Sequence, residues 1–446
     1  MTAHTGFKVA IVGAGPSGFY AAEELLNNEV QVDMYEKLPV PFGLVRYGVA
    51  PDHQKLKLVA KVFDRTARRE NFNFFGNVNV GESLSLQALQ THYHAVILTH
   101  GASQGRKPGI PGEDLHGCYT AADLVGWYNG HPDFQDLAFD PSCRSVAIIG
   151  HGNVAIDIAR ILAKTPAELA SSDITSAALH RLSTSRIETI HLIGRRGPAQ
   201  TRFTSQELRE LGELADAEVW IADDGLTLNA ASREELQDKK NLVASKNYEI
   251  FTGFSRSGTK RRRIVFHFMK FPVAMYGKDR VEELHVGLNE LEGAAFQQTA
   301  RATGVESRIP CDAVVFSIGY RGNGLLQSGF DAAQSVYVNT EGRLPSGDGL
   351  YAAGWIKRGA TGVIGTNKPC AQETVASLLA DLRTEPQTAK AGSAAILPLL
   401  TDIPTSFSDW ESIDREEQAR GQAAGKPREK IVHIEECLAL TAASRR

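Results

Sequence analysis

The first residues with a chemically informative spacing are three glycines near the start of the chain, Gly13, Gly15 and Gly18, arranged as Gly-x-Gly-x-x-Gly. They follow an apolar stretch at residues 8–12 and precede an apolar segment with helical spacing. This arrangement predicts a strand, a tight turn and a helix whose N-terminal amides bind a pyrophosphate. Glu36 closes the next apolar stretch, 18 residues after Gly18 (36 − 18), where an acid typically binds a ribose diol. A carboxylate there repels a 2′-phosphate, so this loop is typical of FAD or NAD sites and not of NADP sites.

A second glycine loop lies further along the chain. Gly150 and Gly152, with Ala155 at the third small position, follow another apolar stretch at residues 145–149. One such fingerprint is weak evidence, because any strand-to-helix turn can use glycine for a positive φ or for close packing. Two complete strand, loop, helix and strand units are much stronger evidence for dinucleotide binding.

The strand expected after the second loop, residues 189–194, ends in Arg195 and Arg196. Guanidinium groups make charge-assisted, bidentate bonds to phosphate oxygens. One such bond is typically worth about 1.5–3 kcal/mol, roughly a tenfold to hundredfold preference for NADP over NAD. The insertion at residues 164–186 lengthens the distance between loop and strand, which weakens the spacing argument and leaves the charge argument unchanged.

The composition limits the class of protein. The 446 residues suffice for two or three domains, and 42% hydrophobic with 22% charged residues is ordinary for a globular protein. A net charge of −4 gives no reason to expect nucleic-acid binding. No apolar run approaches the length of about 18 residues that a membrane span requires, and the first seven residues resemble neither a signal peptide nor an arginine-rich presequence. We therefore expect no nucleic-acid partner, no membrane span and a cytoplasmic location.

The spacing of the cysteines argues against two kinds of redox centre within this chain. The five are scattered along the chain without a Cys-x-x-Cys pair: Cys118, Cys143, Cys311, Cys370 and Cys437. A dithiol flavoenzyme needs two neighbouring thiols, and an iron-sulfur cluster needs about four thiolates within reach. We expect free thiols, so electrons that reach a flavin must leave to an acceptor outside this chain.

The overall pattern predicts an α/β fold with two Rossmann-like dinucleotide-binding domains, the NADP domain being inserted into the FAD domain. Residues 1–105 and 322–446 are expected to form the FAD domain, and residues 106–321 the NADP domain.

Individual elements follow from periodicity and turn signals. We expect helices at residues 55–69, 203–214, 368–382 and 410–421, and strands at residues 72–75, 78–80, 95–98, 311–319 and 350–355. Residues 248–288 have the alternation of an antiparallel meander, with strands at 264–268 and 281–286. The acidic segment 216–238 is expected to be exposed, and residues 383–400 to form a linker or surface strap.

Several stretches resemble one family. They are residues 13–18, 41–53, 150–157, 194–198 and 354–368, with the tail residues 410–414. These motifs look like the adrenodoxin-reductase type of ferredoxin-NADP reductase, and the similarity runs nearly from end to end. The stretch that begins with Gly354 and Trp355 is the most specific, since related flavin reductases usually carry an aspartate directly after that glycine.

The resemblance implies a role for individual residues. FAD would contact Ala14, Glu36, Leu44 and Val80, with Trp355, Gly362, Val363 and Ile364 along its isoalloxazine ring. NADP would be held by Arg106, His151, Gly152, Asn153, Val154, Arg195, Arg196 and Glu210, with Gly362 at the nicotinamide. His53 would lie near flavin and nicotinamide, so His53 and Glu210 are the candidate catalytic residues, and no metal site is expected. Two departures stand out: Ala360 replaces a usual proline, and Thr201 and Arg202 replace smaller residues.

Simpler explanations of single residues stay open. His53 can be a loop cap, Arg46 can bond a carbonyl in its own loop, and Trp355 can be a core residue. The basic run at residues 260–263 is either a solvated surface or a dock for an acidic ferredoxin, for which Arg209 is a comparable candidate.

The leading hypothesis is an FAD enzyme that accepts hydride from NADPH at flavin N5 and passes electrons singly to a ferredoxin-type iron-sulfur protein. One alternative is an NADPH-dependent flavin monooxygenase, although the Phe-x-Gly-x-x-x-His linker signature of that class is missing between the domains. A second alternative is a non-catalytic flavoprotein that senses NADPH. A glutamate-synthase-like subunit is disfavoured, because its cysteine-rich segment is absent. The sequence leaves open the physiological acceptor, the direction of electron flow and the oligomeric state.

Overall fold

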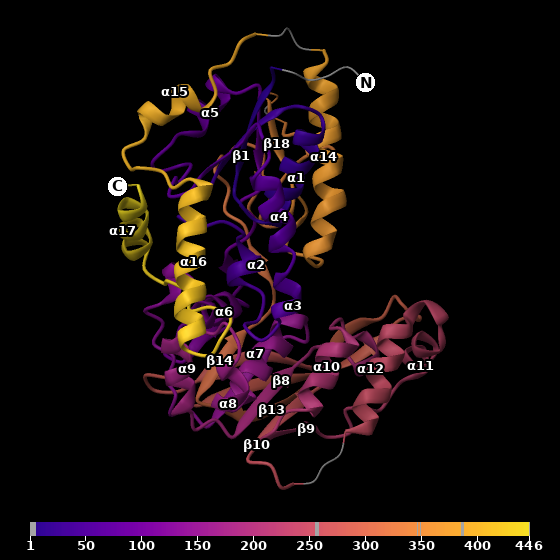
Figure 1. Ribbon diagram of the computed structural model, residues 1–446. Coiled ribbons are helices and arrows are strands. Elements are labelled where there is room, and N and C mark those ends of the chain that lie inside the picture. Colours follow the sequence, from indigo (N-terminus) through magenta and orange to yellow (C-terminus); the bar gives the residue numbers. More distant parts are fainter. Residues whose placement is uncertain (1–5, 255–257, 346, 348, 385–387, 446) are drawn as a thin grey trace. The chain divides into compact units, whose positions relative to one another are not determined.

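The computed structural model describes residues 6–254, 258–345, 347, 349–384 and 388–445. The chain forms two compact units (Figure 1). Unit 1 comprises Met1–Gln104, Asn129–Pro132 and Tyr320–Arg446, and unit 2 comprises Gly105–Tyr128 and Asp133–Gly319.

The segment Asn129–Pro132 groups with unit 1, although the sequence pattern places it in the inserted domain. Asn129 Oδ1 accepts a hydrogen bond from Lys430 Nζ at 3.4 Å. The His131 ring packs on Tyr47 with 4.9 Å between ring centroids. These contacts join positions far apart in the chain, so no local sequence signal reveals them.

Unit 1 is built on a five-stranded parallel sheet in the order β18-β4-β1-β2-β3. Its strands are β1 (Lys8–Val12), β2 (Gln31–Tyr35), β3 (Phe72–Phe75), β4 (Ala95–Leu98) and β18 (Leu350–Ala352). Val9 and Ile11 enter one apolar core, whereas Ala10 and Val12 enter another on the opposite face. The strand order reverses at β1, between β2 and β4. The carboxyl ends of β1 and β4 therefore border a crevice of the kind that binds dinucleotides.

Helices complete unit 1. On one face of the sheet, α1 (Pro16–Asn27) packs along α14 (Asn367–Leu382) through Phe19, Val375 and Leu378 (Figure 1). The other helices are α2 (Leu44–Tyr47), α3 (Gln54–Lys57), α4 (Ala60–Ala67), α5 (Leu86–His92), α13 (Trp355–Arg358), α15 (Ser393–Ile396), α16 (Phe407–Ala423) and α17 (Ile434–Ser444). Strands β16 (Phe330–Asp331) and β17 (Val336–Tyr337) form a short antiparallel pair.

Unit 2 repeats the parallel design with a six-stranded sheet in the order β6-β14-β7-β8-β10-β9. Its strands are β6 (Cys118–Thr120), β7 (Ser145–Ile149), β8 (Thr189–Ile193), β9 (Ala217–Ile221), β10 (Arg262–His267) and β14 (Ala313–Phe316). An antiparallel sheet is added by β11 (Lys270–Tyr276), β12 (Glu283–Glu292) and β13 (Thr299–Pro310). The helices are α6 (Ala121–Asn129), α7 (Asn153–Ala163), α8 (Pro166–Ala170), α9 (Ser176–Ser183), α10 (Ser205–Gly212), α11 (Ala230–Gln237) and α12 (Leu242–Gly253). The α/β class with two Rossmann-like sheets is thus confirmed.

Two expectations about elements of unit 2 are wrong. The alternating stretch at 264–268 belongs to β10, which pairs in parallel with β8 and β9 and is not part of an antiparallel meander. Alternation reports which side chains are buried and not the direction of the neighbouring strand. The acidic segment 216–238 contains β9, whose Ala217, Val219 and Ile221 are all buried.

Two expectations about elements of unit 1 are also wrong. The helix expected at 55–69 is broken into α3 and α4, and Leu58, which lies between them, is 54% exposed. Residues 78–80 form no strand, because Val80 makes only an isolated bridge with Leu84. The expected helices at 368–382 and 410–421 are present as α14 and α16. Within the expected strap 383–400, residues 385–387 lie outside the described residues, and α15 occupies part of the rest.

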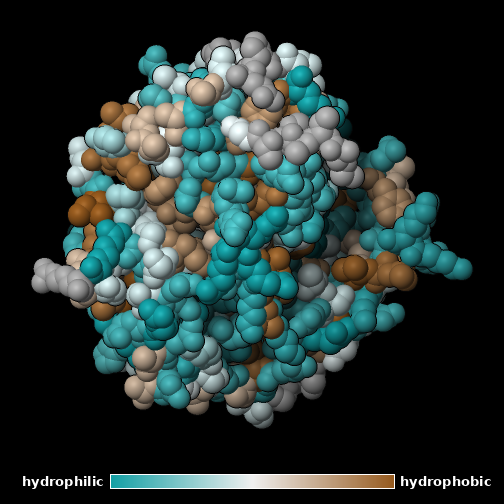
Figure 2. Space-filling view, turned by 45° about the horizontal axis from the view of Figure 1, so that its top comes forward, coloured by the Kyte–Doolittle hydropathy of each residue, from teal (hydrophilic) through white to brown (hydrophobic). Residues whose placement is uncertain are grey.

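Within the described parts of the chain, no helix is both long and apolar enough to cross a membrane. On the face drawn in Figure 2, hydrophilic side chains predominate and apolar side chains are scattered in separate patches. Scattered apolar side chains are ordinary for a protein surface.

Candidate cofactor sites

In the glycine loop of unit 1, Gly13 and Gly18 pack tightly against neighbouring backbone, whereas Gly15 has free space beside it. A Cβ at Gly13, whose φ is +108°, would lie 2.7 Å from Cα of His100, and a Cβ at Gly18 would lie 2.2 Å from the carbonyl oxygen of Gly13. A Cβ at Gly15 would meet nothing within 4 Å. Gly15 also precedes α1 without a side-chain cap. Packing therefore requires two of these glycines, and the third leaves the helix N-terminus accessible to an anion.

Glu36 lies directly beside this loop at the end of β2. Its Oε2 accepts a hydrogen bond from the backbone N–H of Ala14 at 2.7 Å, and its Oε1 accepts one from Leu38 at 3.1 Å. Burial raises the pKa of Glu36, while these backbone bonds lower it in part. A carboxylate has about four acceptor positions, so acceptor capacity remains beside these backbone bonds for a ribose hydroxyl. The residues of unit 1 thus fit the adenosine half of FAD.

The loop at residues 41–53 borders the same turn. Leu44, an expected FAD contact, begins α2 and is 37% exposed. Val80, also expected at FAD, is buried in an apolar core with Val78 and Leu84, so its side chain is a packing residue. His53 stands at the N-cap position of α3 and makes no side-chain cap bond, which does not support its interpretation as a loop cap.

The Trp355 stretch forms a tight turn after β18. Gly354 has φ +78°, and a Cβ there would lie 1.9 Å from Ser17 Oγ. The Trp355 ring lies 5.7 Å from that of Tyr320, and its Nε1 donates to the carbonyl of Thr361 at 3.1 Å. Trp355 is half-buried and Val363 is 60% exposed. This open apolar surface fits a planar ring such as isoalloxazine.

Arg358 fixes the loop that carries Gly362, Val363 and Ile364. Its guanidinium donates to Thr361 Oγ1 at 3.0 Å, Thr366 Oγ1 at 3.2 Å and Asn367 Oδ1 at 3.0 Å. Sequence reasoning missed this role, although the Arg358 position lies within the recognised motif. The bonds brace the loop that follows Ala360.

The glycine loop of unit 2 has the same design. Gly150 has φ +128°, and a Cβ there would lie 2.2 Å from the carbonyl oxygen of Ser317. A Cβ at Gly152 would meet nothing within 4 Å, and Gly152 precedes α7 without a side-chain cap. Asn153 and Val154 form the first turn of α7, so their amides are available to an anion.

His151 lies in this loop, but its side chain points into the unit. Its Nε2 lies 3.0 Å from the carbonyl oxygen of Leu192, and its ring packs edge-on against Phe266 and Phe268. Burial lowers the pKa of His151 to about 4, so the imidazole is neutral near pH 7. The imidazole is therefore a packing group, and only the backbone of His151 is placed to contact a ligand.

Arg195 and Arg196 follow β8 as expected. Their carbonyls are fixed by Asn289 Nδ2 at 3.0 Å and by the backbone N–H of Met269 at 3.1 Å. Arg195 is exposed, Arg196 is half-buried, and Arg196 Nε is a buried donor without a hydrogen-bond acceptor. Among the described residues, neither guanidinium has a carboxylate partner. Both are thus available to a phosphate, which fits NADP.

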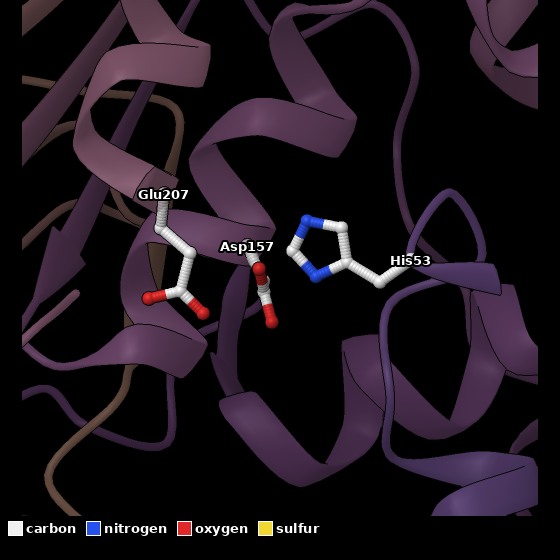
Figure 3. A group of neighbouring side chains, drawn as sticks. All are labelled: His53, Asp157 and Glu207. Atoms are coloured by element: carbon white, nitrogen blue, oxygen red, sulfur yellow. The ribbon is translucent and has the colours of Figure 1, made fainter. Parts of the chain in front are cut away.

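A polar cluster between α7 and α10 was not foreseen. Arg160, 1% exposed, pairs with Asp157 at 2.8 Å and lies 3.6 Å from Glu210 Oε2. Figure 3 shows Asp157 together with Glu207; one carboxylate oxygen of Glu207 lies within 4.8 Å of one of Asp157. Glu207 also completes the capping box of α10 with Thr204. Glu210, an expected catalytic and NADP-binding residue, is thus placed beside a buried arginine.

Other expected residues of unit 2 have mixed outcomes. The backbone N–H of Arg106 donates to the carbonyl of Gly319 at 3.0 Å. In the basic run, Arg262 is 2% exposed and donates to the carbonyls of Ile187 and Ala163. A buried arginine cannot contact a protein partner, so the run at 260–263 is neither a wholly solvated surface nor a continuous dock.

Comparison with known proteins first gives the broad class. The family model for pyridine nucleotide-disulphide oxidoreductases matches residues 7–192. The chain is also 41% identical over 450 residues to the mitochondrial NADPH:adrenodoxin oxidoreductase of Bos taurus, covering 97% of this chain and 92% of that protein. It is 41% identical over 455 residues to the NADPH-ferredoxin reductase FprA of Mycobacterium leprae, covering 98% and 99%.

A solved structure agrees with these relatives. Mycobacterium tuberculosis FprA in complex with NADPH matches with a TM-score of 0.91 and 39% identity, over 98% of this chain and 99% of that one. The chain therefore belongs to the family of NADPH:adrenodoxin oxidoreductases and NADPH-ferredoxin reductases. The family that the sequence motifs indicate is confirmed.

Proposed function

We propose that this protein is an FAD-dependent oxidoreductase that takes hydride from NADPH and passes electrons one at a time to a ferredoxin-type iron-sulfur protein. The observation that carries the proposal is the contrast between Glu36 beside the first glycine loop and Arg195 and Arg196 after the second. Family membership supports it, since the bovine relative is named for adrenodoxin and the mycobacterial ones for ferredoxin.

FAD is assigned to unit 1 and NADP to unit 2, with the sequence domains 1–105 plus 322–446 and 106–321 as their extents. The open faces at Gly15 and Gly152 support this assignment, because each lies at an uncapped helix N-terminus. When bound, the flavin accepts two electrons from NADPH and releases them singly. The protein contributes binding and orientation, and no catalytic triad is required.

The remaining site residues have positioning roles in this proposal. Trp355 and the Arg358-braced loop with Gly362, Val363 and Ile364 provide the surface for the isoalloxazine ring. His53 is proposed near the reacting rings. Glu210 is proposed to contact NADP and to be a candidate catalytic residue; its carboxylate lies 3.6 Å from the buried Arg160.

A partner dock is proposed around Arg209 on α10, which is exposed. The run at 260–263 is a weaker candidate, because Arg262 is buried, Arg261 pairs with Asp216 and Arg263 faces the Trp220 ring. A cytoplasmic location stays a prediction, since the family includes proteins named mitochondrial.

The test is NADPH-driven reduction of cytochrome c by the purified protein, with and without an added ferredoxin, over a range of salt concentrations. The proposal expects reduction that depends on ferredoxin and weakens as salt screens the acidic partner from the basic dock. Reduction that is equally fast without ferredoxin at every salt concentration would contradict the proposed partner. An Arg209→Gln variant should weaken the ferredoxin dependence and leave the reduction of ferricyanide unchanged.

A further inference from the structure

We propose that Arg46 and Glu417 form a positioning pair through which helix α16 holds α2 against the first glycine loop and so retains FAD. The inference rests on the assignment of FAD to unit 1. Neither residue belongs to the glycine loop, and the two are 371 positions apart in the chain.

The segment that leads into α2 lies directly on the glycine loop. The backbone N–H of Phe42 donates to the carbonyl of Ala14 at 2.9 Å. A Cβ at Gly43 would lie 3.1 Å from Cα of Gly15, the glycine whose other side is open. The position of α2 therefore determines one wall of the space in which a pyrophosphate would lie.

The backbone of this segment adopts an unfavourable conformation at Phe42. Phe42 has φ +83° and Gly43 has φ +46°. A positive φ is costly for a bulky residue and persists only where the surroundings enforce it. Backbone bonds within the segment, such as Val45 N–H to the carbonyl of Phe42 at 3.0 Å, are supplemented by contacts from other elements.

Arg46 supplies such a contact from the middle of α2. Its Nη1 donates to Glu417 Oε2 at 2.8 Å, and its Nη2 bonds to Oε1, which makes a bidentate pair. Arg46 is 5% exposed, and the Glu417 side chain is fully buried. Sequence analysis left open that Arg46 bonds a carbonyl in its own loop, and the structure assigns it a carboxylate on α16 instead. A buried charge that loses its partner is strongly unfavourable, so the pair fixes α2 relative to α16.

Glu417 is itself held rigidly. Its Oε2 also accepts from Arg428 Nη1, and its Oε1 accepts from the backbone N–H of Ile431, both at 2.9 Å. Burial alone would raise the pKa of Glu417, but Arg46 and Arg428 lower it below the ordinary value. The carboxylate is therefore charged and has its acceptor positions filled.

An aromatic contact also connects α16 with the segment that carries Phe42 and Arg46. The Arg46 guanidinium lies over the Trp410 ring of α16 at 5.1 Å, and Trp410 meets Phe42 edge-on with 5.7 Å between centroids. Both routes from α16 thus end on the segment that covers the glycine loop.

The test uses the holoenzyme with Glu417→Gln or Arg46→Lys and follows FAD release on dilution by the rise in flavin fluorescence. Glutamine leaves the Arg46 charge buried without its counter-ion, and lysine keeps the charge but loses the bidentate fork. We expect FAD to dissociate about tenfold faster or more in both variants, because the wall of its site is no longer held. Hydrogen exchange should rise in the peptide that covers residues 39–48 and stay unchanged in β7 of unit 2.

The matched control is Arg420→Gln, which removes the half-exposed pair of Arg420 with Glu436 between α16 and α17. Arg420 lies three residues from Glu417 on the same helix (420 − 417), and its pair does not reach α2. We expect FAD release within about twofold of the parent protein.

Unchanged FAD release in Glu417→Gln and Arg46→Lys would overturn the inference. It would also be overturned if hydrogen exchange rose throughout unit 1, or if neither variant folded, since the pair would then serve general stability. The assay contains neither NADPH nor ferredoxin. Failure of the proposed function would instead appear as a parent protein that binds no FAD.

Discussion

Glu36 Oε2 accepts a hydrogen bond of 2.7 Å from the backbone N–H of Ala14, in the turn that also presents Gly15. The acid therefore has two tasks: it fixes the loop and it places acceptor atoms beside it. Local sequence predicts the presence of an acid here, but only the structure reveals its bond to the loop.

Replacing this acid should weaken FAD binding. In Glu36→Gln, the amide loses the charge that favours a hydroxyl pair, and a charge-assisted bond is worth about 1.5–3 kcal/mol, so affinity should fall roughly tenfold to hundredfold. Fluorescence titration of the FAD-depleted protein with FAD measures the change. The exposed Glu70→Gln variant serves as the control. Equal affinities for Glu36→Gln and the parent protein would remove Glu36 from the site.

His151 should make stability depend on pH. The ordinary histidine pKa of 6.5 is lowered by burial to about 4, so the unfolded chain binds this proton more tightly than the folded protein. The stabilising contribution is fully present above pH 6.5 and is lost as the pH falls towards 4. Between neutral and acidic pH, the free energy of unfolding should therefore fall less in His151→Gln than in the parent protein. The difference between the two falls should be up to about 3 kcal/mol. Urea unfolding at several pH values tests this, with exposed His180→Gln as the control; parallel curves for His151→Gln and the parent protein would contradict it.

Sequence patterns predict the glycine loops well but do not predict contacts between residues far apart in the chain. Both glycine loops, Glu36 and Arg195 were recognisable because their signals lie within one strand, turn and helix. The strand direction of β10 was not recognisable, because alternation of buried and exposed residues is the same in both sheet types. The pairs Arg46–Glu417 and Asn129–Lys430 join residues more than 300 positions apart, where a single sequence carries no pairing signal.

Local composition was also a poor guide to which residues are buried. The acidic surroundings of β9 indicated an exposed segment, yet Ala217, Val219 and Ile221 supply a buried edge of the parallel sheet. Likewise His151 sits in a phosphate-loop motif, and only its contacts with Leu192, Phe266 and Phe268 identify its ring as a packing group.

Gly354 should tolerate no side chain. A Cβ there would lie 1.9 Å from Ser17 Oγ, which bonds Asn367 Oδ1 at 3.0 Å, and the backbone has φ +78°. We expect Gly354→Ala to lower the free energy of unfolding by about 2–4 kcal/mol through strain and overpacking. Thermal unfolding measures the loss. Gly253→Ala serves as the control, because a Cβ there meets nothing within 4 Å, and it should be nearly neutral. Equal unfolding midpoints for Gly354→Ala and Gly253→Ala would contradict the prediction that Gly354 tolerates no side chain.

The cysteines should take no part in turnover. All five are free, and burial raises the pKa of Cys143, Cys311 and Cys437 to about 12. Few thiolates are therefore present near neutral pH. The number of thiols that react with a disulfide reagent should be the same before and after anaerobic reduction by NADPH. Two additional thiols after reduction would point to a redox-active disulfide and against an external single-electron acceptor.

The most direct test of the central claim is coenzyme selectivity in a variant with both Arg195→Ala and Arg196→Ala, measured as ferricyanide reduction with NADPH and with NADH. Each lost guanidinium removes a charge-assisted bond to the 2′-phosphate worth about 1.5–3 kcal/mol, so KM for NADPH should rise at least roughly tenfold. KM for NADH should change little, because NADH carries no phosphate at that position. A similar rise for both coenzymes, or none for NADPH, would contradict the assignment of unit 2 to NADP.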